Sequence, residues 1–200
     1  MKNKSIVFAL IICGAGLAVL AGVYFIQKNK ALINPSEQDG PTTTKTQNKI
    51  VTDSFSINLP DGWTQTTAPT GATAMAVNSN DNITDPEAKK INFQSYFAVV
   101  YGALSGKSMK EYIQLVKDSL PQKFGSVVFV KEQDLTINGQ QAHQIEIEIN
   151  QQGVNFKVLL VLIKGQADDA WMLSFNTTKS NWEDYQEIFY TTADSFIVKK

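Results

Sequence analysis

His143, the only histidine in the chain, is the residue whose type best suits acid–base chemistry or the activation of a nucleophile. Such a histidine needs a nucleophile and an orienting carboxylate that converge on it in space. The sequence has no Gly-x-Ser-x-Gly element that would supply the nucleophile. We therefore predict a protein that is not an enzyme and has no catalytic residue, with an envelope hydrolase or other enzyme built around His143 as the alternative.

Oxygen-bearing side chains, the ligands that calcium prefers, gather in residues 78–90. An EF-hand loop has a glycine at the position of Ile83 and a glutamate at the position of Lys89, so the spacing fails. A single histidine and a single cysteine also supply no His or Cys metal cluster. We predict a solvated polar loop, no metal site and no cofactor. The residues considered as ligands are Asn78, Asn80, Asp81, Asn82 and Asp85.

Glu146 and Glu148 are a pair of carboxylates two residues apart in a segment of strand character, so they share one face. Paired carboxylates can divide the acid and base roles of a reaction. The opposite face carries isoleucines, which are expected to point into the core. We predict that the two glutamates form an exposed, charged outer face.

The longest apolar run covers residues 5–26 and contains no charged residue. As a helix its 22 residues would span about 33 Å, enough to cross a hydrocarbon core of about 30 Å. We predict a cytoplasmic tail at 1–4 and a single-pass membrane anchor at 5–26. The remainder is expected on the extracytoplasmic side of the cell membrane.

Two other interpretations of the N-terminus stay open. The residues Val19, Leu20 and Ala21 resemble a signal-peptide cleavage site, although the apolar run continues beyond them. Cys13, the only cysteine, raises a lipoprotein signal, but Ile12 is bulkier than the residue that normally precedes a lipidated cysteine. Cys13 is more easily explained as a small apolar residue in the membrane.

The composition after the apolar run excludes one large class of partners. Residues 31–200 contain 14 lysines, no arginine and 19 acidic residues, a formal charge of −5. An acidic domain without arginine lacks the basic surface and the bidentate clamps that bind nucleic acid. We predict no nucleic-acid partner.

Residues 27–52 are polar and are predicted to be a flexible linker, followed by one folded domain at 53–200. Alternating or β-branched patterns predict strands in seven segments of that domain. Ser108 and Ser180, each three residues before a glutamate, predict two capped helices. Asn138-Gly139 is the favoured pair of a tight hairpin turn. The predicted strands cover 55–59, 74–78, 92–104, 126–137, 141–149, 154–164 and 170–178.

Successive hairpins with two helices indicate an α+β fold in which an antiparallel sheet packs between helices. The stretch Phe55-x-Ile57-x-x-Pro60-x-Gly62-Trp63 resembles the opening of the PsbP-like family, relatives of the photosystem II accessory protein. The helix after SGKS, the hairpin at 137–142 and the final helix before Phe196 follow in that family's order. The resemblance covers 54–198 and implies an accessory or binding protein. It supplies no functional residue, and Trp63 is predicted to be structural.

We therefore expect a membrane-anchored, extracytoplasmic accessory or binding domain. Residues 5–26 would contact the membrane, and the partner would be an envelope protein or a small-molecule ligand. A pocket, if present, is expected between the sheet and a helix, lined by aromatic residues. A purely structural envelope component is a further alternative. The residues that would bind a ligand are unknown from the sequence.

Overall fold

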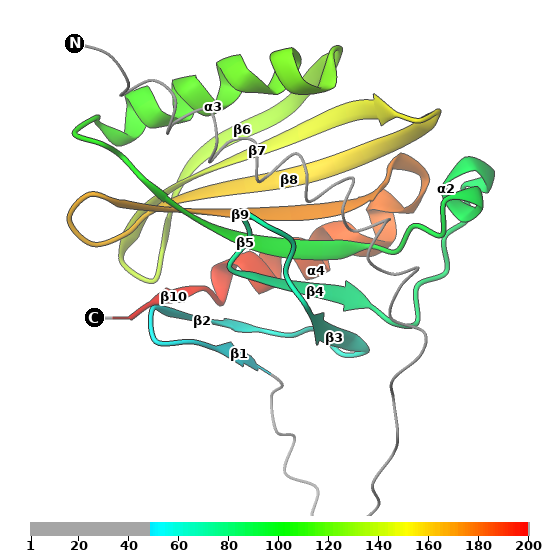
Figure 1. Ribbon diagram of the computed structural model, residues 1–200, viewed down its shortest axis with the longest axis horizontal. Helices are drawn as coiled ribbons and strands as arrows, with labels where there is room; N and C mark the ends of the chain where they lie inside the picture. The colour runs from blue at the N-terminus through cyan, green and yellow to red at the C-terminus, as the bar shows by residue number, and fades with distance from the viewer. Residues whose placement is uncertain (1–48, 200) are drawn as a thin grey trace, which may run out of the picture.

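The computed structural model describes residues 49–199, which form an α+β domain (Figure 1). The predictions for 1–4, for the anchor at 5–26 and for most of the linker lie outside the described residues. Within 49–199 no helix is both long and apolar enough to cross a membrane.

Seven strands form one antiparallel sheet in the order β3-β4-β5-β9-β8-β7-β6. The predicted strand at 74–78 is confirmed as β4, and the predicted hairpin at Asn138-Gly139 joins β6 to β7 with positive φ at both residues. The strand at 63–66 was not predicted. The strands are β3 (Trp63–Thr66), β4 (Ala74–Asn78), β5 (Tyr96–Ala103), β6 (Val127–Ile137), β7 (Gln140–Gln151), β8 (Val154–Lys164) and β9 (Asp169–Thr178).

A second, three-stranded sheet brings the two ends of the domain together. Its central strand β2 (Phe55–Asn58) pairs with β1 (Lys49–Val51) and with β10 (Ile197–Val198). Strand β1 falls within the segment 27–52 that the sequence assigned to the linker. Ile50 is buried in the core, so the folded domain includes at least 49–51.

The helices follow the sequence signals in part. The predicted capping box of α3 (Met109–Phe124) is confirmed: the Ser108 hydroxyl accepts from the Glu111 backbone N–H while the Glu111 carboxylate accepts from Ser108 N–H. Pro121 lies inside α3 and does not end it. A short helix, α2 (Pro86–Lys90), forms where a loop was predicted, because Asp85 caps its first turn.

The second predicted capping box is wrong. Helix α4 (Trp182–Asp194) follows a 3₁₀ turn, η1 (Lys179–Asn181), that contains Ser180, and α4 starts without a side-chain cap. The Asn181 side chain, which occupies the N-cap position, instead donates to the Asn82 carbonyl and accepts from the Thr178 hydroxyl. The start of α4 is therefore fixed by distant segments of the chain, which a local pattern does not show.

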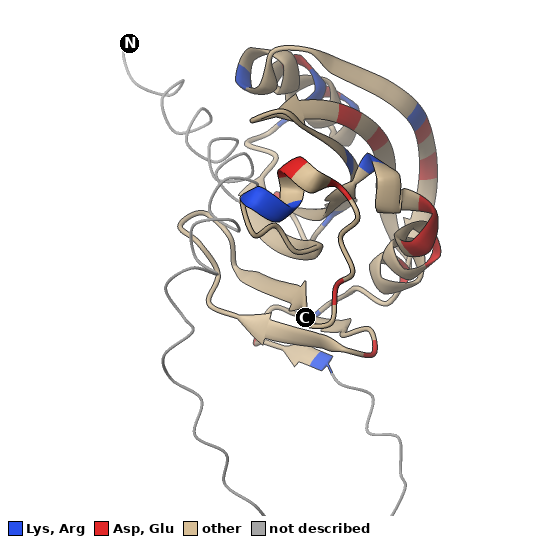
Figure 2. Ribbon diagram, turned by 90° about the vertical axis from the view of Figure 1, so that its right-hand side faces the viewer, with Lys and Arg blue, Asp and Glu red and all other residues tan. Residues whose placement is uncertain are grey.

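The seven-stranded sheet has a hydrophobic core on each face, which confirms the predicted arrangement between helices (Figure 1). Helix α3 packs on one face through Met109, Tyr112, Val116 and Leu120. Helix α4 and the three-stranded sheet pack on the other face, which we call the α4 face. Acidic and basic residues are interspersed over the domain (Figure 2).

Trp63 belongs to the core of the α4 face, as predicted. Its backbone N–H donates to the Pro60 carbonyl at 3.1 Å across a turn in which Gly62 has a φ of 79°. The fixed turn directs the indole against Phe97, at 5.7 Å between ring centroids, and against Phe189 of α4, at 6.2 Å. The side chain is 4% exposed.

Replacing Trp63 by alanine is expected to lower the free energy of unfolding by about 3–5 kcal/mol, because the substitution removes a buried indole and leaves a cavity. Urea denaturation of the full-length protein in detergent measures the change. Gln65→Ala, at an exposed position of the same strand, is the control and should stay within about 0.5 kcal/mol of wild type. Equal effects of the two substitutions would show that Trp63 does not hold α4 on the sheet.

Candidate functional site

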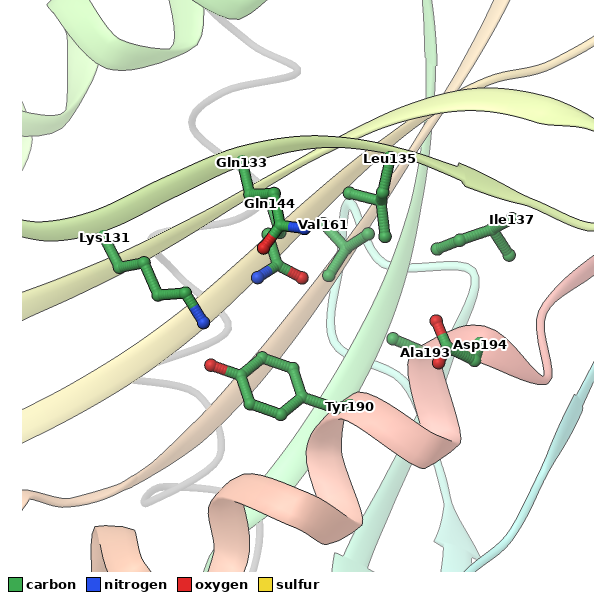
Figure 3. Close-up of a pocket in the computed structure, with 9 residues that line it drawn as sticks. All are labelled: Lys131, Gln133, Leu135, Ile137, Gln144, Val161, Tyr190, Ala193 and Asp194. Atoms are coloured by element: carbon green, nitrogen blue, oxygen red, sulfur yellow. The ribbon is translucent and has the colours of Figure 1, made fainter.

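A cavity of about 270 Å³ lies on the α4 face, between α4 and the strands β6, β7 and β8 (Figure 3). We call it the α4 cavity. It lies between sheet and helix, as the sequence predicted for a pocket, but its only aromatic lining residue is Tyr190. The lining residues are Lys131, Gln133, Leu135, Ile137, Gln144, Val161, Tyr190, Ala193 and Asp194.

Two carboxamide side chains project side by side into the middle of this cavity. Gln133 of β6 and Gln144 of β7 are register partners in the antiparallel pair, so both point to the α4 face. Gln144 is only 7% exposed, yet within residues 49–199 neither amide makes a hydrogen bond to the protein. The Gln144 amide atoms are not among the fully buried, unpaired side-chain atoms of residues 49–199, so they are open to water or to a ligand in the cavity. The cavity therefore presents unsatisfied donors and acceptors to an occupant.

A buried carboxylate lies behind one end of the cavity, in contact with Lys131 and Tyr190. The Glu146 side chain is 6% exposed and accepts a hydrogen bond from the Tyr190 hydroxyl. Its second oxygen lies 3.1 Å from Lys157 Nζ, and that ammonium stands over the Trp182 ring at 4.4 Å. Burial, the hydrogen bond to Glu146 and the charge of Glu146 raise the pKa of Tyr190, so the hydroxyl stays protonated and donates to the carboxylate.

Lys131 is the more weakly held partner of that carboxylate. Its Nζ lies 3.8 Å from Glu146 Oε1 and 5.3 Å from the centroid of the Tyr190 ring, and its side chain is 51% exposed. Two lysines thus face one glutamate, which leaves a formal charge of +1 at this end. A register shift between Phe129 and Lys131 marks a β-bulge, and it turns Lys131 to the α4 face while Phe129 packs on the α3 side.

The other end of the cavity is apolar and ends at a carboxylate. Leu135, Val161 and Ala193 form the walls beyond the two glutamines, and Asp194 lies past them at the end of α4 (Figure 3). The Asp194 side chain makes no ion pair within the part of the chain that the structure describes. The cavity therefore runs from a cation, past two amides, to an anion.

The prediction that Glu146 and Glu148 form an exposed outer face is wrong for Glu146. Both glutamates share one face, as predicted, but α4 and its preceding turn cover that face. Glu148 is partly buried and pairs with Lys179 of η1 at 2.6 Å. The covering segment lies more than thirty residues further along the chain, so the pattern of β7 alone does not predict the burial.

His143 lies on the α3 side of β7, one residue before Gln144 and therefore away from the α4 cavity. Its Nδ1 lies 2.6 Å from Asp134 Oδ1, and its Nε2 lies 3.5 Å from Glu132 Oε2. Glu132 in turn pairs with Lys117 of α3 at 2.7 Å. Both ring nitrogens thus face carboxylates, and no hydroxyl of the described residues is recorded in contact with the ring.

The polar segment at 78–90 makes hydrogen bonds to α4. Asp81 accepts from Ser95 N–H and from the Tyr185 hydroxyl, both at 2.5 Å, and Asn78 donates to the same hydroxyl at 2.7 Å. Burial, followed by the hydrogen bond to Asp81, raises the pKa of Tyr185. Asp85 is occupied by its cap of α2. These side chains make structural hydrogen bonds, and within 49–199 no three His, Cys, Asp or Glu side chains are grouped as metal ligands.

Two further hollows lack the features of the α4 cavity. A groove between the Pro60 turn and α4 is lined by Asp61, Glu183, Asp184 and Glu187 and by no basic residue. The second hollow is bordered by Trp171 and Tyr101, and its lining includes the buried Trp171 Nε1, which has no hydrogen-bond partner among residues 49–199. Of these three hollows, only the α4 cavity is lined by a carboxamide that belongs to a buried residue and makes no hydrogen bond to residues 49–199.

No protein-family model matches the sequence, and no curated protein matches it. Solved structures do match. Cyanobacterial PsbP (CyanoP) from Synechocystis is 13% identical over 83% of this chain and all of its own, with a TM-score of 0.58. LpqN of Mycobacterium tuberculosis, involved in cell envelope biogenesis, is 11% identical over 79% of this chain and 88% of its own, with a TM-score of 0.56.

The Ran-binding protein Mog1p of Saccharomyces cerevisiae is 15% identical over 76% of this chain and 96% of its own, with a TM-score of 0.52. The described domain thus has the PsbP-like fold that the sequence resemblance implied. At these identities the likeness is one of fold, so the site must be argued from this chain's own residues.

Tyr190→Phe is expected to lower the free energy of unfolding by about 1–3 kcal/mol, because it removes a donor from a buried carboxylate. Tyr101→Phe is the matched control: its hydroxyl also donates to a carboxylate, that of Asp169 at 2.6 Å, but the residue is exposed. That change should cost about 0.5 kcal/mol or less. Chemical denaturation measures the free energy of unfolding of both variants. An unchanged value for Tyr190→Phe would mean that the hydrogen bond from Tyr190 does not stabilise the buried Glu146 carboxylate.

Proposed function

We propose that this protein is a membrane-anchored, extracytoplasmic accessory domain that binds a ligand in the α4 cavity and does not transform it. The observation that carries the proposal is Gln144, a residue only 7% exposed whose amide is open to the cavity and makes no hydrogen bond to residues 49–199. An amide open to the cavity can bond an occupant that brings its own donors and acceptors. The fold supports a binding role, since Mog1p is a Ran-binding protein.

The contents of the cavity support binding without catalysis. Its charged lining groups are Lys131 and Asp194, at opposite ends; Lys131 contacts Glu146 behind the cavity, and Tyr190 is held as a donor to Glu146. No base stands beside a nucleophile there, which is the arrangement that covalent or general-base catalysis requires. His143, the basis of the alternative enzyme, lies on the other side of the sheet strand.

The location is proposed from the sequence. Residues 5–26 would hold the domain at the membrane, and the polar segment that follows would let it stand away from the surface. A short positive tail before a single span usually remains in the cytoplasm, which puts the domain outside. The fold of LpqN, a protein involved in cell envelope biogenesis, is consistent with that location.

A thermal-shift screen of small polar compounds on the full-length protein in detergent tests the binding role. A ligand at about 100 times its dissociation constant adds about 2.7 kcal/mol of stability, which raises Tm by about 5–10 °C for a chain of this size. Gln144→Leu should abolish the shift, because it removes the unpaired amide. Gln141→Leu, the same change at an exposed position of β7, should retain it.

Mass spectrometry of the recovered compound completes that test. Recovery of the compound unchanged supports binding without turnover, whereas a product would favour the enzyme. A screen without hits would favour the purely structural role. A shift that persists in Gln144→Leu would place the ligand elsewhere.

Protease treatment of intact spheroplasts tests the location. The domain should be digested without lysis, and the untreated protein should stay with the membrane during alkaline extraction, because a transmembrane helix resists it. Deletion of 5–26 should move the protein to the soluble cytoplasmic fraction. Protection of the wild-type domain in intact cells would reverse the proposed orientation.

A further inference from the structure

We propose that the occupant of the α4 cavity is a short peptide of about three residues with both termini free. Its carboxylate would face Lys131, its backbone amides would pair with Gln144 and Gln133, and its ammonium would face Asp194. The inference rests on the proposed function, because it names the ligand class of that same cavity. It follows from the order of the charged, amide and apolar groups along the cavity.

The cationic end favours a carboxylate. Lys131 and Lys157 face the single buried carboxylate of Glu146, and Lys157 is the closer of the two, at 3.1 Å against 3.8 Å. Lys131 is half exposed and therefore has donors to offer to a second anion. A phosphate dianion would need more donors than this one loosely held ammonium supplies.

The middle of the cavity matches a peptide bond. A carboxamide has a carbonyl acceptor and an N–H donor side by side, which is the complement of the C=O and N–H of a peptide group. Gln133 and Gln144 lie on neighbouring strands in register and project together into the cavity (Figure 3). Each can pair with a peptide unit of an extended ligand, and Gln144 is already ordered by its burial.

The far end matches an aliphatic first residue with a free ammonium. Leu135, Val161 and Ala193 provide an apolar wall between the glutamines and Asp194. A small aliphatic side chain would gain burial there. The Asp194 carboxylate, which has no ion pair within 49–199, would face the ligand's N-terminus.

The dimensions limit the ligand to about three residues. Tyr190 and Asp194 are one helical turn apart, about 6 Å along α4, and Lys131 stands 5.3 Å from the Tyr190 ring. Lys131 and Asp194 lie at opposite ends of the cavity lining (Figure 3), and an extended chain of about three residues spans about 10 Å. The volume of about 270 Å³ is also slightly below the usual range of small-molecule sites, which begins at about 300 Å³.

Isothermal titration of the full-length protein in detergent with leucylglycylglycine tests the proposal. Saturable binding with one peptide per chain is expected. The C-terminal amide and the N-acetylated form should each bind about tenfold to a hundredfold more weakly, because each loses one charge-assisted contact. Triglycine should also bind more weakly, because it lacks the aliphatic side chain.

Variants of the protein locate each contact. Lys131→Gln should weaken the binding of leucylglycylglycine and leave the binding of its C-terminal amide unchanged. Asp194→Asn should also weaken the binding of leucylglycylglycine, but it should leave the binding of the N-acetylated form unchanged. Lys164→Gln, on an exposed lysine at the end of β8, is the control and should change nothing. If N-acetylation is tolerated, the ligand is the C-terminus of a longer chain and the Asp194 contact is overturned.

The failure of this inference differs from failure of the proposed function. If the tripeptide does not bind but another compound stabilises the protein in a manner that depends on Gln144, the peptide is overturned and the binding role stands. If neither the tripeptide nor any screened compound binds in a manner that depends on Gln144, the peptide proposal and the binding role are both overturned. Equal binding of the peptide and its two blocked forms would also overturn the assigned orientation.

Discussion

The packing of α4 against the sheet is the constraint on which the rest of the α4 face depends. Phe189 contacts Trp63 of β3, Phe175 of β9 and Tyr185 of its own helix, with ring centroids 5.3–6.2 Å apart. These rings set the distance between helix and sheet. One turn later the helix presents Ala193, which is too small to fill that distance over β7 and β8. The cavity is therefore a consequence of large side chains at one place and a small one at the next.

A buried carboxylate makes the polar end of this cavity rigid. Glu146 is stable in the interior only while its partners remain, because an unpaired buried charge is strongly destabilising. Tyr190, Lys157 and Lys131 come from a helix and two strands, so the carboxylate links all three elements. The β-bulge after Phe129 is what turns Lys131 to this side. A ligand would meet groups that are already in position, which lowers the entropy lost on binding.

Local patterns in the sequence predicted the sheet, the hairpins and α3, because alternation, Asn138-Gly139 and the Ser108 capping box act over a few residues. They did not predict β1, because Ile50 and Val51 stand in a polar stretch and the burial of Ile50 depends on pairing with β2. The α4 cavity was not predicted residue by residue. In the sequence, Gln144 and Glu146 resemble exposed positions of an outer face. Their burial results from the packing of α4, which no residue of β7 predicts.

The most direct test of the account is the position of the ligand on the domain. Side-chain amide resonances of ¹⁵N-labelled full-length protein in detergent can be followed by NMR during titration with leucylglycylglycine. We expect the NH₂ signals of Gln144 and Gln133 to move together and saturate, while those of Gln141 and Gln114, away from the α4 cavity, stay in place. Shifts confined to α3 or to the acidic groove beside Pro60, with Gln144 unchanged, would contradict it.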